Sequence, residues 1–213
     1  MTDDSSRLRL NVACAVSTLP DLSSARTNAG HWRLAWGETP PTPFTLAPVV
    51  HGGADRCAFD VVETYARGDD FVVTHQPTAE FPFRSQLYWR TAPLAEPNAV
   101  VVLVTFSLQT DLLDAQPVTQ LACEAASHVV LDGQAVQTLD GRMTVMPLEV
   151  DRAECESMAD SAGGVIRFAP PFLEKGVIRR ARFAAVLNAE PISDDQLDEI
   201  ASQAADQPLP LTT

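Results

Sequence analysis

Hydrophobic and polar residues alternate with a period of two along much of the chain, which is the pattern of β-strands with one buried face. Residues 81–90, FPFRSQLYWR, are the clearest case. The apolar face of this predicted strand carries Phe81, Phe83, Leu87 and Trp89. The opposite face carries Arg84, Gln86, Tyr88 and Arg90. We expect the first face to lie in the core, whereas the second is either a ligand-binding surface or the solvated side of a sheet.

Similar alternation predicts strands in residues 8–16 and 31–36. Residues 57–76 are typical of a hairpin, in which Val61 and Tyr65 share a face of the first strand and Phe71 and Val73 lie on the second. The turn contains an Arg-Gly-Asp tripeptide at 67–69, which we interpret as ordinary turn chemistry and not as an adhesion motif.

Two further patterns define strands in the second half of the chain. The run NAVVVLVTFSL, residues 98–108, is continuously apolar, as expected of a strand that is covered on both faces. Asp-Gly pairs at 132–133 and 140–141 separate three apolar segments within residues 127–150. Because Asp-Gly favours two-residue type I′ turns, this region predicts a three-stranded antiparallel meander. Two more strands are predicted near residues 164–169 and 176–187.

Strong helix signals occur at the C-terminal end of the chain, near residues 194–206. Ser193 and Gln196 have the spacing of a capping box, and Ile192 and Leu197 have that of a hydrophobic staple. The apolar stripe of this helix comprises Leu197, Ile200, Ala201 and Ala204. We therefore expect the helix to dock on a sheet with its acidic side outward.

These elements predict a mainly β protein: an antiparallel β-sandwich of about ten to twelve strands with one C-terminal amphipathic helix. We expect a single domain over residues 1–213. The segment TAPLAEPN, residues 91–98, contains two prolines and has no periodicity, so it is the best candidate for a linker. The alternative is therefore two small β-domains, residues 1–92 and 98–213.

The net charge of the chain disfavours some classes of binding partner. It has 15 basic and 28 acidic residues and a net charge of −13, which disfavours nucleic acid and membrane as partners. The first residues do not have the basic and apolar pattern of a secretory signal, so we do not expect one there. The longest apolar run, residues 99–106, is too short to span a bilayer. The four cysteines, which form no Cys-x-x-Cys pair, are Cys14, Cys57, Cys123 and Cys155. We expect reduced thiols and a cytoplasmic location.

No motif of a known catalytic or cofactor-binding type is present, including the nucleophile elbow and the glycine-rich phosphate loops. The four histidines are dispersed, at His31, His51, His75 and His128. His51 with Asp55 offers a metal or general-base site as one interpretation, and a loop histidine is the simpler one. His75 shares a face with Phe71 and Val73, so we expect a hydrogen-bonded, partly buried imidazole. We predict no metal site and no cofactor.

One segment is positively charged although the chain as a whole is strongly acidic. Residues 174–182, EKGVIRRAR, contain Lys175, Arg179, Arg180 and Arg182 against a single glutamate. Arginine side chains can bind carboxylate or phosphate groups in a bidentate manner. They can equally act as internal counter-ions for the acidic residues, including those of the predicted helix. If this strand shares a sheet with residues 81–90, one polar face gathers Arg84, Tyr88, Arg90, Arg180 and Arg182.

Such a face suits a small anionic ligand or a sugar, because tyrosine can stack on a ligand while arginines donate hydrogen bonds to it. The three tryptophans, Trp32, Trp36 and Trp89, alternate with polar residues and are expected to pack in the core. The leading hypothesis is therefore a non-catalytic β-sandwich that binds a polar or anionic small ligand, such as a sugar or a phosphate ester, or a protein partner. One alternative is a hydrolase or isomerase that uses His51, His75 and nearby carboxylates, and another is a structural or assembly protein.

Overall fold

The computed structural model describes residues 8–11, 18–19, 22–23, 25–26, 32–36, 44–50, 61–67, 70–79, 81–92, 99–117, 119–124, 128–160, 163–188 and 190–209. Side chains are described only from residue 61 onward, with gaps. The protein is mainly β, and its described residues contain one α-helix, α1 (Asp194–Ala205), and one 3₁₀ helix, η1 (Glu149–Glu154). The strands are β1 (Leu8–Asn11), β2 (Thr18–Leu19), β3 (Leu22–Ser23), β4 (Ala25–Arg26), β5 (Trp32–Trp36), β6 (Phe44–Val50), β7 (Val61–Arg67), β8 (Asp70–His75), β9 (Phe83–Ala92), β10 (Ala99–Thr110), β11 (Thr119–Glu124), β12 (His128–Leu131), β13 (Ala135–Thr138), β14 (Met143–Pro147), β15 (Cys155–Asp160), β16 (Gly163–Phe168) and β17 (Ile178–Asn188).

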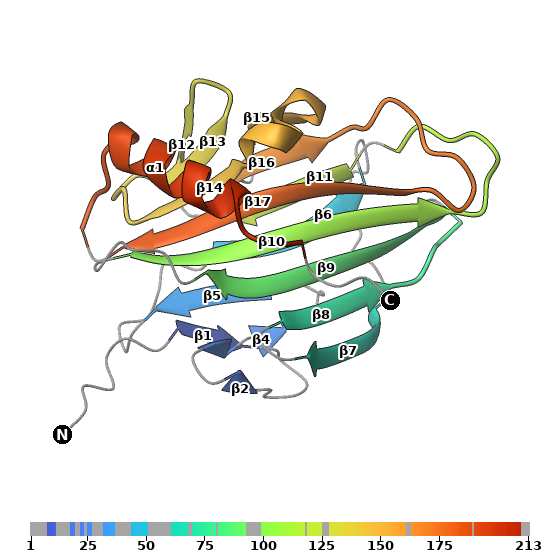
Figure 1. Cartoon of the computed structure of the whole chain (residues 1–213), viewed down its shortest axis with the longest axis horizontal. Coiled ribbons are helices and arrows are strands. Elements are labelled where there is room, and N and C mark those ends of the chain that lie inside the picture. The colour runs from blue at the N-terminus through green and yellow to red at the C-terminus, as the bar shows by residue number, and fades with distance from the viewer. Residues whose placement is uncertain are drawn as a thin grey trace.

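Two large antiparallel sheets contain nearly all of these strands (Figure 1). The eight-stranded sheet has the order β12-β13-β14-β17-β10-β9-β8-β7. The seven-stranded sheet has the order β1-β5-β6-β11-β16-β15, with β4 also paired to β5, and β2 and β3 form a separate pair. The described strands number seventeen, more than the ten to twelve predicted. Three of them, β2, β3 and β4, consist of only two residues, which is too short for any periodic signal.

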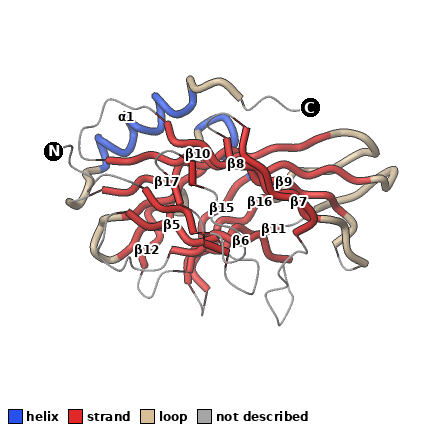
Figure 2. Tube along the Cα trace, turned by 90° about the horizontal axis from the view of Figure 1, so that it is seen from below, coloured by secondary structure: helices blue, strands red, loops and turns tan. Residues whose placement is uncertain are grey.

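The main group of buried apolar side chains draws on both sheets. Phe106 of β10 and Phe168 of β16 lie edge to face, with ring centroids 6.1 Å apart and an interplanar angle of 75°. Gly164 of β16 lies so close to Val136 of β13 that a Cβ atom at this position would clash with the valine side chain. Side chains of the two sheets therefore contact each other through these strands, and Figure 2 shows helix α1 on one side of the strands.

Helix α1 covers part of the outer face of the eight-stranded sheet (Figure 1). The capping box of Ser193 and Gln196 is present, and the predicted apolar stripe is buried. It packs against side chains of β10, β14 and β17 that point away from the other sheet, including Val101, Met146, Ala184 and Val186. The opposite faces of β10 and β17 lie in the main core, so the apolar run at residues 98–108 is covered on both faces, as predicted.

The meander of β12, β13 and β14 is antiparallel, as predicted, but its two turns differ. Asp132 and Gly133 have φ angles of 45° and 69°, the left-handed values that a type I′ turn requires at both central positions. In the second turn the amide of Gly141 donates to the carbonyl of Thr138, and Asp140 has no positive φ. Gly141 is therefore the last residue of a four-residue turn, so the prediction of a second type I′ turn is wrong.

Strands β7 and β8 form the predicted hairpin, but a β-bulge interrupts β7 between Val61 and Glu63. An extra residue in a strand reverses the faces on which later residues point. Val61 pairs with His75 on the core side, whereas Tyr65 pairs with Val72 on the outer side. The prediction that Val61 and Tyr65 share a face is therefore wrong, and Tyr65 joins the outer face of the sheet.

The strand predicted at residues 81–90 is strand β9, which begins at Phe83, two residues later than predicted. The side chains of Phe81, Phe83, Leu87 and Trp89 are buried in the main core, as predicted. Strands β9 and β10 pair from Phe83 to Ala92, so the candidate linker of residues 91–98 joins two hydrogen-bonded neighbours. Among the described residues, no helix has both the length and the apolar character needed to cross a bilayer.

Candidate functional site

The two arginine-bearing strands lie in one sheet, on either side of β10. Thr105 of β10 is opposite Tyr88 of β9 on one side and Arg182 of β17 on the other. Residues directly opposite each other in an antiparallel pair point to the same face, and alternate residues along a strand share a face. The predicted residues Arg84, Tyr88, Arg90, Arg180 and Arg182 therefore all belong to the outer face of this sheet, which we call the arginine face.

Tyr88 lies near the centre of the arginine face and is only 6% exposed. Its hydroxyl group donates a hydrogen bond of 2.8 Å to Oε1 of Gln86, whose amide nitrogen donates to Thr74 on β8 at 3.2 Å. Burial raises the pKa of Tyr88, and the neighbouring Tyr65 and Asp70 raise it further against the opposing charge of Arg180. The tyrosine is therefore a protonated, anchored part of the surface and not the freely exposed ring expected for a solvated strand.

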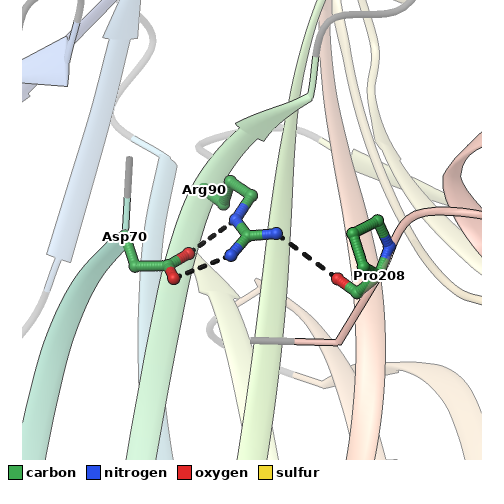
Figure 3. A network of polar contacts seen from close by, with 3 residues as sticks. All are labelled: Asp70, Arg90 and Pro208. Atoms are coloured by element: carbon green, nitrogen blue, oxygen red, sulfur yellow. Dashed lines mark hydrogen bonds and ion pairs between the residues drawn. The ribbon is translucent and has the colours of Figure 1, made fainter. Parts of the chain in front are cut away.

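Arg90 is held between the sheet and the C-terminal segment (Figure 3). Its Nε and Nη2 atoms donate to the two carboxylate oxygens of Asp70 at 2.6 and 2.7 Å, a bidentate ion pair between neighbouring strands. Its Nη1 atom donates to the backbone carbonyl of Pro208 at 3.3 Å. Arg90 therefore acts as an internal counter-ion, one of the two roles that the sequence left open for the arginines.

Arg182 makes an equivalent arrangement with the 3₁₀ helix. Oδ2 of Asp151 accepts hydrogen bonds from both the backbone amide and the Nε atom of Arg182, each at 3.1 Å. Nη1 of Arg182 donates to the carbonyl of Ala205, the last residue of α1, at 3.5 Å. The last turn of α1 contains no basic residue, so a guanidinium from β17 supplies the positive charge that stabilises a helix C-terminus.

An open groove of about 410 Å³ runs along the start of β17. Arg179, Arg180 and Arg182 line it on one side, and Asp151 and Glu154 of η1 line it on the other. Three partly exposed apolar side chains, Val150, Ile178 and Leu209, complete the lining. The guanidinium of Arg179 also lies 5.9 Å from the ring centroid of Phe172. The volume falls within the range of small-molecule sites.

The predicted residues are divided among three hollows. Arg180 and Arg182 line the open groove, whereas Tyr88, Arg90 and Arg182 line a cavity of about 20 Å³, which is large enough for a water molecule. Arg84 is exposed and lines a separate hollow of about 170 Å³ with Pro77, Gln109, Thr110 and Asp111. The five predicted residues therefore lie on one face of the sheet but do not line one common hollow.

His75 is hydrogen-bonded, as predicted, but it is fully buried and not partly buried. It is 1% exposed, and its Nδ1 atom lies 3.1 Å from the hydroxyl oxygen of Ser85 on the neighbouring strand. His51 and Asp55 lie outside the described residues, as do the side chains of Trp32 and Trp36. Within the described part of the chain, no group of three or more His, Cys, Asp or Glu side chains is arranged to hold a metal ion.

Asp70 and Asp151 are the residues of the site that sequence reasoning missed. In the sequence, Asp70 directly follows the turn tripeptide at 67–69, and Asp151 is one of many acidic residues. Each pairs with an arginine that is at least 20 residues away in the chain. In a chain with 28 acidic residues, no local signal separates these two from the solvated ones.

Cys155, beside the groove-lining Glu154, gives a prediction about reactivity. Burial, followed by the nearby charges of Asp151 and Glu154, raises the pKa of its thiol to about 12. The thiolate is the reactive form, so we expect iodoacetamide at pH 8 to label Cys155 at least about 100-fold more slowly in the folded protein than in the unfolded protein. Mass spectrometry of the labelled peptide measures both rates. Native labelling within a few-fold of the unfolded rate would show that the thiol is accessible and ionised.

Comparisons with known proteins do not assign this chain to a protein family. No protein-family model and no curated protein matches the chain. Among solved structures, it is similar to a mutant of the heparan sulfate lyase HepC from Pedobacter heparinus, with 10% identity and a TM-score of 0.43 over 76% of this chain and 31% of that one. It is also similar to heparinase III, the BT4657 gene product, with 8% identity and a TM-score of 0.40 over 77% of this chain and 30% of that one. The chain thus spans about a third of the length of either lyase.

Proposed function

We propose that this protein is a non-catalytic binding domain that takes a small anionic ligand, such as a phosphate ester, in the groove beside β17. The observation that carries the proposal is the open groove of about 410 Å³, lined by Arg179, Arg180 and Arg182 within a chain of net charge −13. Arg180 and Arg182 share the outer face of β17, and guanidinium groups there favour anions, since charge-assisted hydrogen bonds are stronger than neutral ones.

The lining also suggests how a ligand is oriented. Arg182 is held by Asp151, so its guanidinium is fixed in place before any ligand arrives. Such preorganisation reduces the entropy that binding costs. The partly exposed apolar side chains of Val150 and Ile178 offer contact for the uncharged part of a ligand. A sugar phosphate, with an anionic group and a less polar ring face, combines both features.

The proposal includes the finer architecture. We propose that the two packed antiparallel sheets form one β-sandwich domain over residues 1–213, in preference to two domains divided at residues 92–98. The pairing of β9 with β10 across this segment supports a single domain. A cytoplasmic location is proposed from the acidic composition and the scattered cysteines alone.

A thermal-shift experiment tests ligand binding. The probes are inorganic phosphate, pyrophosphate and glucose 6-phosphate, with glucose as the neutral control. At 100 times its dissociation constant, a bound anion adds roughly 2.7 kcal/mol to the free energy of unfolding. In a chain of 213 residues, each kcal/mol of added stability raises the melting temperature by roughly 2–4 °C.

Matched variants locate the site. Arg180→Ala removes a groove arginine, and we expect it to abolish most of the shift. Arg167→Ala removes the same charge from β16 of the other sheet, where Arg167 pairs with Glu156 at 3.4 Å, and should leave the shift unchanged. If no anion raises the melting temperature, or if both variants lose the shift equally, the proposed groove is not the binding site.

A further inference from the structure

Beyond helix α1 the chain continues across the arginine face, and we call residues 206–209 the C-terminal strap. The amide of Gln207 donates to the carbonyl of Ala204 at 3.2 Å, which ends the helix. The carbonyl of Pro208 then accepts the hydrogen bond from Arg90 (Figure 3). Gln207, Pro208 and Leu209 line the cavity of about 20 Å³, whose other walls include Tyr88 and Arg90. The strap therefore covers the part of the arginine face around Tyr88 and Arg90.

The strap also separates the covered cavity from the open groove. Both hollows are lined by Arg182, which lies beneath, and by Leu209, which belongs to the strap. No other residue lines both within the described part of the chain. Removing the strap would therefore open the cavity toward the groove and leave Tyr88, Arg90, Arg180 and Arg182 along one hollow.

The attachment of the strap is weak compared with that of the helix before it. The buried stripe of α1 ends at Ala204, and beyond it Asp206, Pro208 and Leu209 are exposed, with Leu209 at 47%. The guanidinium groups of Arg90 and Arg182 hold this region through backbone carbonyl oxygens, at Pro208 and at Ala205. Neutral carbonyl groups are weaker acceptors for guanidinium than anionic oxygens are.

We infer that the C-terminal strap is a displaceable cover, and that a ligand with two linked anionic groups replaces it, one group at the groove and the other at Arg90. This inference rests on the proposed function, because it extends the same groove. The displaced carbonyl of Pro208 returns to water, and an anionic oxygen of the ligand takes its place on Nη1 of Arg90. The ligand class is therefore a pyrophosphate-like or doubly anionic compound in preference to a single phosphate.

Hydrogen exchange on the full-length protein tests displacement directly. Amide exchange in the peptide that covers residues 203–213 is compared without ligand, with inorganic phosphate and with inorganic pyrophosphate. We expect pyrophosphate to accelerate exchange in this peptide and phosphate to leave it unchanged. If pyrophosphate raises the melting temperature but leaves exchange there unchanged or slower, the strap is not displaced, although the proposed function stands. If pyrophosphate does not bind, the inference is wrong; the proposed function is wrong as well only if phosphate and glucose 6-phosphate also leave the melting temperature unchanged.

A variant that loosens the strap gives an independent readout. Pro208→Gly keeps the carbonyl acceptor. It increases the conformational freedom of the strap when the strap is displaced, so the displaced state becomes more populated. We expect the dissociation constant for pyrophosphate to fall about two- to fivefold. Pro171→Gly makes the same change in an exposed loop that lines neither hollow, and should leave the affinity unchanged. Equal or weaker binding by Pro208→Gly would overturn the inference.

Discussion

Replacing Phe106 by alanine is expected to lower the free energy of unfolding by about 3–5 kcal/mol, because it leaves a cavity between the two sheets. Phe106 is 1% exposed and its ring meets Phe168 from the opposite sheet. Chemical denaturation monitored by circular dichroism measures the change. Phe172→Ala is the matched control: Phe172 is 42% exposed, so its loss should cost less than about 1 kcal/mol.

The double variant of Phe106 and Phe168 measures the contact between the sheets. An edge-to-face aromatic pair contributes about 0.5–1.5 kcal/mol beyond the area that it buries. We therefore expect the double alanine variant to lose less stability than the sum of the two single variants, by about that amount. Strict additivity would mean that the two rings do not interact, and a small effect of Phe106→Ala alone would contradict the packing of the sheets.

Much of the local structure follows from short-range signals in the sequence. The capping box of Ser193 and Gln196 and the stripe of Leu197 and Ile200 determine where α1 begins and which side it buries, because both depend only on neighbours within two turns. The type I′ turn at Asp132 and Gly133 is equally local. These elements were predicted correctly for that reason.

The errors lie where one residue changes the register of a strand or turn. The extra residue in β7 places Tyr65 on the outer face. Gly141 is the last residue of its turn and not a central one, so the second hairpin connection is longer than predicted. Neither change alters the composition of its segment. Periodicity and dipeptide signals therefore detect the hairpins but do not determine which way each side chain points.

The candidate site depends on pairings between distant segments. The five predicted residues share a face because β10 pairs with β9 on one side and with β17, about 80 residues further along, on the other. The sequence showed that each strand carries arginines, and it left open whether the strands share a sheet. It contained no signal for the strap, since Gln207 and Pro208 read only as the end of a helix.

The partners of the arginines change how the face should be interpreted. Arg90 and Arg182 are both bound to aspartates of neighbouring elements, so part of the positive charge is compensated internally. Arg90 and Arg182 are therefore positioned side chains, and Nη1 of each donates a further hydrogen bond to a backbone carbonyl. A ligand would compete with these carbonyls more readily than with the carboxylates, because only the carbonyls are neutral.

Tyr88 and Trp89 are adjacent in β9 and are expected to respond differently to truncation. Trp89 is 0% exposed in the main core, so Trp89→Ala should cost about 3–5 kcal/mol of unfolding free energy. The alternation of the strand alone would make Tyr88→Ala nearly neutral. The 6% exposure of Tyr88 corrects this expectation to a loss within the range of about 0.5–3 kcal/mol of ordinary substitutions.

Tyr88→Phe separates the ring from its hydroxyl group. It removes only the hydrogen bond to Gln86, so it should cost about 0.5–1.5 kcal/mol, which urea denaturation can resolve from the alanine variant. The smaller cost of Tyr88→Ala compared with Trp89→Ala follows from what covers each ring: a second sheet over the tryptophan, and a strap with exposed residues over the tyrosine. If Tyr88→Ala is as costly as Trp89→Ala, the strap is as firmly packed as the core and its displacement by a ligand is untenable.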